Sequence, residues 1–96
     1  MSELKYKGIR FESLRCSYPD GFAIELWRRG LFRRRSHVAT VFLPETGDEL
    51  TYEVHLGPAS APSEFVDSFI ADAKLELQQW RTEWAANIPN SSSEAD

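Results

Sequence analysis

Between Ser63 and Ile88 the chain contains no glycine or proline, although the 96 residues include five of each. Apolar residues recur along this stretch in alternating steps of four and three, which is the spacing of one face of an α-helix. These residues are Val66, Ile70, Ala73, Leu77, Trp80 and Trp84, with Phe65 and Phe69 widening the stripe. Ser60 and Ser63 can cap free N–H groups, so we expect one long amphipathic helix to begin between them and to end before Pro89.

The chain that precedes this helix is divided into short segments with the two-residue period of half-buried strands. Two segments show the pattern clearly, Phe22–Arg28 and Leu50–Leu56. The segment Ser36–Leu43 is rich in β-branched and aromatic residues, but its apolar residues fall on both parities, which indicates a strand inside the sheet. A further segment, Leu4–Tyr18, changes phase near Ser13, which predicts a bulge, a bend or two short strands. Two groups of turn residues separate the segments, namely Pro19–Gly21 and Pro44–Asp48.

These elements predict an α+β fold, in which a three- to four-stranded antiparallel meander sheet is followed by the helix packed on one face. The sheet residues expected beneath the helix are Phe22, Ile24, Leu26, Tyr52, Val54 and Leu56. The opposite face is expected to stay open to water or to a partner, and to carry Glu25, Trp27, Thr51, Glu53 and His55. Residues 1–88 are predicted to form a single domain, and the polar residues 89–96 a disordered tail.

The composition excludes several classes of protein. A chain that is 42% hydrophobic and 12% aromatic is typical of a globular domain. No apolar run approaches the roughly 20 residues that span a bilayer, and the N-terminus lacks the apolar stretch of a signal peptide. We therefore expect a cytoplasmic protein without a membrane segment. The single cysteine, Cys16, excludes an intramolecular disulfide and a thiol-rich metal site, and its strand parity predicts a buried, unreactive thiol.

No recognisable catalytic motif is present. The two histidines, His37 and His55, lie outside any nucleophile motif, and there is no glycine-rich phosphate loop. Glu45, Asp48 and Glu49 lie close together, but without the spaced ligand set of a calcium loop they are typical of a solvated turn. We expect a protein that is not an enzyme, with no catalytic residues, no metal and no cofactor.

Charge is distributed unevenly along the chain, although the formal net charge is only −4. Residues 1–43 hold nine Lys and Arg against four acidic residues, whereas residues 44–96 hold two against eleven. Five arginines fall within eight residues between two predicted strands: Arg28, Arg29, Arg33, Arg34 and Arg35. Arginine provides a planar fork for carboxylate or phosphate, which lysine does not. Trp27 and Phe32 flank the cluster and would add aromatic contact area.

Three interpretations of this arginine-rich loop remain open. The arginines could pair with the protein's own acidic helix or simply be solvated. They could bind a protein partner with an acidic surface, because arginine with an exposed aromatic residue is typical of binding hot spots. They could also contact the phosphates of a nucleic acid. A sequence pI of about 5.1 favours the protein partner, so we expect a small protein-binding module that acts through Trp27, Phe32 and these arginines.

A separate hypothesis concerns the back of the helix. Leu75 lies about 200° from Ala73 at 100° per residue, and is therefore expected opposite the apolar stripe. Ser68, Thr82 and Ala86 fall near it, so this strip could seat a second helix in a symmetric dimer. A monomer with one exposed leucine is the alternative, and we expect a monomer or a weak homodimer.

Overall fold

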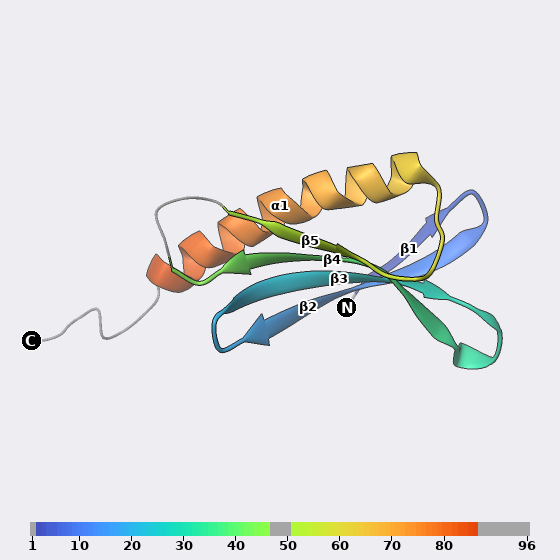
Figure 1. Ribbon diagram of the computed structural model, residues 1–96, viewed down its shortest axis with the longest axis horizontal. Coiled ribbons are helices and arrows are strands. Elements are labelled where there is room, and N and C mark those ends of the chain that lie inside the picture. The colour runs from blue at the N-terminus through green and yellow to red at the C-terminus, as the bar shows by residue number, and fades with distance from the viewer. Residues whose placement is uncertain (1, 47–50, 87–96) are drawn as a thin grey trace, which may run out of the picture.

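The computed structural model describes residues 2–46 and 51–86 as five strands, one short 3₁₀ turn and one helix (Figure 1). The predicted tail at 89–96 and the turn residues Asp48 and Glu49 lie outside these ranges. The elements are β1 (Ser2–Tyr6), β2 (Ile9–Tyr18), β3 (Gly21–Arg29), η1 (Leu31–Arg33), β4 (Arg35–Pro44), β5 (Glu53–Leu56) and α1 (Ser63–Ala86).

The strands form one antiparallel meander sheet in the order β1-β2-β3-β4-β5, so the predicted α+β class and topology are confirmed. The sheet has five strands rather than three or four, because the chain turns at Lys7 and Gly8. Both residues have positive φ, 50° and 82°, as a tight two-residue hairpin turn requires. The expected break in the first segment therefore lies at this turn, and β2 runs without interruption past Ser13.

A β-bulge explains the apolar residues on both parities of the central strand β4. Leu26 pairs with Ala39, but the next residue, Trp27, pairs with His37, which leaves Val38 without a directly opposed residue. Val38 and Ala39 are both buried in the core. Beyond the bulge, His37 lies beside Trp27 on the open face of the sheet.

Helix α1 lies against β3 and β4, and its most buried residues are Phe69, Ala73 and Leu77. The predicted stripe is therefore correct in its centre, and Phe69 proves more buried than its neighbours. The sheet residues fully enclosed beneath the helix belong mainly to the three central strands: Phe11, Phe22, Ile24, Leu26, Val41 and Leu43.

Two residues expected in the core are instead exposed. Val54 is 40% exposed and Leu56 is 71% exposed, because the helix lies over β3 and β4 while β5 forms the sheet edge. Tyr52 does reach the helix, since its hydroxyl donates a 3.0 Å hydrogen bond to the carbonyl of Lys74. At the end of the helix, Trp84 packs against Phe22 with ring centroids 5.8 Å apart, although 39% of it remains exposed.

The first hairpin is tied to the start of the helix. The ring of Tyr6 stacks on Phe65, and its hydroxyl donates to Glu64. Lys7 forms an ion pair of 3.0 Å with the same carboxylate. Further along, Arg15 pairs with Glu76 and lies over the Trp80 ring. Within the described ranges, no helix has the length and apolar character needed to cross a membrane.

Candidate functional site

The hairpin of β3 and β4 extends away from the helix and ends in η1 (Figure 1). We call residues 30–34 the hairpin tip. The tip is closed by two main-chain hydrogen bonds: the Gly30 N–H donates to the Arg34 carbonyl at 2.7 Å, and the Arg34 N–H donates to Leu31 at 3.2 Å. These bonds define the backbone of the tip while its apolar side chains remain in solvent.

Phe32 is the most unusual residue of the tip. Its backbone is left-handed, with φ 59° and ψ 37°, a conformation that bulky side chains rarely adopt. Its side chain is 91% exposed, and the neighbouring Leu31 is 79% exposed. Neither burial nor backbone preference accounts for a phenylalanine at this position. Such strain is found where a residue serves something other than the stability of its own chain.

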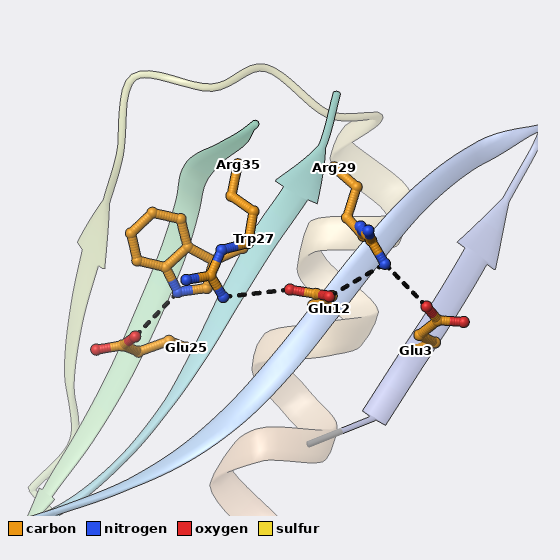
Figure 2. Close-up of polar contacts among 6 residues, drawn as sticks. All are labelled: Glu3, Glu12, Glu25, Trp27, Arg29 and Arg35. Carbon is orange, nitrogen blue, oxygen red and sulfur yellow. Dashed lines mark hydrogen bonds and ion pairs between the residues drawn. The ribbon is translucent and has the colours of Figure 1, made fainter. Parts of the chain in front are cut away.

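Arg28, Arg29 and Arg35 have partners within the protein. The Arg28 guanidinium donates a 2.9 Å hydrogen bond to the carbonyl of Ser60, in the segment before the helix. Arg29 and Arg35 lie directly opposite each other on β3 and β4, which places two like charges side by side. Figure 2 shows that both reach Glu12 on β2, each at 3.3 Å.

The buried carboxylate of Glu12 holds the base of the hairpin in place. Its side chain is only 9% exposed, although it lies on the open face of the sheet. Arg29 also pairs with Glu3 at 3.0 Å, so that the contacts form one chain from β4 to β1 (Figure 2). The alternative in which the loop arginines pair with the acidic helix does not hold for Arg29 and Arg35, because the acidic residues they reach are on the sheet.

Trp27 lies on the open face as expected, but its ring is already in contact with neighbours. Its indole N–H donates a 2.9 Å hydrogen bond to Glu25, and the Arg35 guanidinium lies 5.4 Å from its ring centroid (Figure 2). The His37 ring packs at 5.2 Å, with its Nε2 2.6 Å from the Thr40 hydroxyl oxygen. Trp27 therefore supports the hairpin base and is only half-buried.

Among the predicted contact residues, Phe32 and Arg34 remain the most available. The Arg34 side chain is exposed and makes no hydrogen bond or ion pair with any residue in the described ranges. Arg33 belongs to η1 at the same tip. The structure thus separates the predicted site into an exposed tip with Phe32 and Arg34, and a braced base with Trp27, Arg28, Arg29 and Arg35.

Sequence reasoning missed three residues of this region. Leu31 is 79% exposed and adds a second apolar side chain to the tip beside Phe32. Lys5 and Arg10 face each other across β1 and β2 on the same sheet face as Glu12. Both are exposed, and neither has an ion-pair partner in the parts of the chain that the structure describes. Recognising the turn at Lys7–Gly8 would have predicted this pair, because a two-residue hairpin turn places residues at equal distances from it opposite each other.

Leu75 lies on the outer side of the helix and is 62% exposed, as the helical spacing predicts. It borders a shallow depression with Gln78, Gln79, Thr82 and Glu83. These neighbours are mostly polar and give a partner helix little apolar surface. Leu75 remains a hypothesis for self-association.

Burial, assisted by the neighbouring carboxylate of Glu25, raises the pKa of the Cys16 thiol, so a reactive thiolate is disfavoured there. The described ranges contain no group of three or more His, Cys, Asp or Glu side chains placed to hold a metal ion.

No family model, curated protein or solved structure matches this chain. The function must therefore be argued from the geometry of its residues.

Proposed function

We propose that this chain is a small, stand-alone protein-binding module, such as an adaptor, a regulator or an inhibitor, that acts in the cytoplasm without catalytic activity. In this proposal, the hairpin tip inserts Phe32 and Leu31 into an apolar pocket of the partner, while Arg34 pairs with a carboxylate at the rim of that pocket. Acidic groups on the partner are favoured because Lys5, Arg10 and Arg34 have no acidic partner among the described residues.

The observation that carries the proposal is Phe32. A bulky residue at φ 59° lowers the stability of the folded chain. Because its side chain is 91% exposed, it gains no burial inside the protein that would offset this cost. An exposed aromatic residue beside an arginine is, however, the composition of a binding hot spot. The remainder of the hairpin supports this use, because Glu12 bridges Arg29 and Arg35 and so holds the tip in one position.

The geometry offers less support for nucleic-acid binding. Bases of a single strand stack on free aromatic faces. The Trp27 ring is already in contact with Arg35 and His37, which leaves Phe32 as the one predicted contact residue with a free ring. We therefore retain nucleic acid as the alternative that an experiment must address.

The experiment compares binding by the wild type, Phe32→Ser and Arg34→Glu with that by a control, Leu75→Ser, on the opposite side of the molecule. Proteins captured from the native cell by the wild type are ranked by how much less of each is captured by both tip variants. The first-ranked protein is then purified, and its binding to each variant is titrated. We expect each tip variant to weaken its binding at least about tenfold, which corresponds to roughly 1.4 kcal/mol, while the control is unchanged.

A parallel titration with a fluorescent oligonucleotide tests the alternative. Phosphate binding would show a steep loss of affinity with added salt and a loss in Arg34→Glu. The proposal would be overturned in favour of the nucleic-acid function by two results together: tight, salt-sensitive binding of the oligonucleotide, and no captured protein whose binding depends on Phe32.

A further inference from the structure

The outer edge of β5 offers a second interaction surface, on a part of the molecule other than the hairpin tip. β5 is the last strand of the sheet, and no described residue pairs with its outer side. Edge strands present unpaired main-chain groups that can add another strand. Its apolar residues, Val54 and Leu56, are also those the helix leaves exposed.

The hydrogen-bond phase shows which residues of β5 face outward. Gly57 donates its N–H to the Val38 carbonyl at 2.9 Å. In an antiparallel ladder, every second residue directs its N–H and C=O groups toward the neighbouring strand, so the register fixes which residues of β5 face β4. Glu53 and His55 therefore direct their main chain toward β4. Val54 and Leu56 direct theirs away from the sheet, toward a potential new strand.

We propose that β5 pairs antiparallel with β5 of a second copy of this chain, about a two-fold axis at Val54. Each Val54 would then exchange main-chain hydrogen bonds with Val54 of the second copy. Leu56 would lie opposite Tyr52 of the second copy, and Glu53 would lie opposite His55 of the second copy. The sheet would continue through both molecules.

The pairing of a carboxylate with an imidazole selects both the partner and the register. Glu53 and His55 are exposed on the open face, 3.3 Å apart within one strand. A two-fold axis at Val54 places each His55 beside a Glu53 of the second copy, and does so twice. Shifting the axis to Glu53 would oppose two carboxylates, which is a disfavoured pair. Shifting it to His55 would lose both contacts between Glu53 and His55.

The helix side of the same edge is apolar and self-complementary. A groove of about 400 Å³ lies between β5 and α1, lined by Val54, Leu56, Val66 and Ile70 among others. In the proposed register, Tyr52, Val54 and Leu56 of the two copies form three cross-strand apolar pairs beside this groove. Such pairs stabilise antiparallel strands. A four-residue strand makes only a short ladder, so the dimer is expected to be weak.

The test measures self-association by sedimentation equilibrium over a wide range of protein concentration. Val54→Pro removes an N–H that points away from β4, so it should break the new ladder while leaving the existing one. His55→Glu places carboxylates opposite each other. We expect each change to weaken dimerisation at least about tenfold.

The exchange variant Glu53→His/His55→Glu restores a carboxylate opposite an imidazole on both sides of the axis, and should return the dimerisation constant to within about threefold of the wild type. Leu75→Glu tests the alternative dimer through the back of the helix, and under this proposal it should leave dimerisation unchanged. A wild type that stays monomeric at every concentration would overturn the proposal. So would a dimer that Leu75→Glu disrupts and Val54→Pro does not, or a failure of the exchange variant to restore association while circular dichroism shows it folded.

Discussion

Arg35 on β4 forms an ion pair with Glu12 on β2, across the strand β3 that lies between them. The same carboxylate also forms an ion pair with Arg29, which faces Arg35 directly in the β3–β4 ladder. One buried negative charge therefore compensates two positive charges that would otherwise repel each other. The arrangement explains how an arginine-rich hairpin can remain ordered close to the exposed tip.

Replacing Glu12 with Gln should lower the free energy of unfolding by about 1.5–3 kcal/mol, since it removes the charged acceptor of both arginines. Urea denaturation measures the change. Glu53→Gln is the control, because that carboxylate is exposed on the same sheet face and its loss should cost less than about 0.5 kcal/mol. Equal effects of the two substitutions would show that Glu12 does not brace the hairpin.

Charge reversal should separate the base of the hairpin from its tip. Arg35→Glu places a second carboxylate against Glu12 and should cost at least about 1.5 kcal/mol of stability. Arg34→Glu lies at the exposed tip and should change stability by less than about 0.5 kcal/mol. Reversal of the whole arginine cluster is therefore an unsuitable test of binding, because it would also destabilise the fold. A stable Arg35→Glu variant would contradict this division.

Leu77→Ala should lower the free energy of unfolding by about 2–5 kcal/mol, because Leu77 is fully enclosed between the helix and the sheet. Leu75→Ala, two residues away on the exposed side, should change it by less than about 0.5 kcal/mol. Thermal and urea denaturation measure both. Similar losses from the two variants would mean that the helix is rotated from the orientation described.

The helix and its inward face could be predicted from the sequence because its spacing is regular and no glycine or proline interrupts it. The turn at Lys7 and Gly8 was missed, since lysine is not a usual residue at positive φ. The bulge at Val38 and the burial of Glu12 could not be predicted either. Both depend on the register in which β3 pairs with β2 and β4, and the sequence of a single strand does not determine that register.

The free energy of unfolding should decrease as the pH is lowered, and Glu64 should account for part of the decrease. A hydrogen bond from its own backbone N–H at the start of α1, assisted by Lys7 and Tyr6, lowers the pKa of this carboxyl from 4.5 to about 2. Because the folded pKa is lowered, the contribution of Glu64 is complete above about pH 4.5 and is lost as the pH falls toward about 2.

This dependence is measured by urea denaturation of the wild type and Glu64→Gln at a series of pH values. The difference in unfolding free energy between them should be largest near neutral pH and should shrink through this acidic window. A difference that stays constant with pH would show that Glu64 makes no such contribution.

The most direct test of the binding proposal measures two properties of one variant, Phe32→Asn. Asparagine tolerates the left-handed backbone better than phenylalanine, so the free energy of unfolding should rise by about 0.5–1 kcal/mol. Binding to the partner identified through the tip should nevertheless fall at least about tenfold, because the exposed aromatic ring is lost. A variant that is more stable and still binds as the wild type does would contradict the proposal that Phe32 contacts the partner.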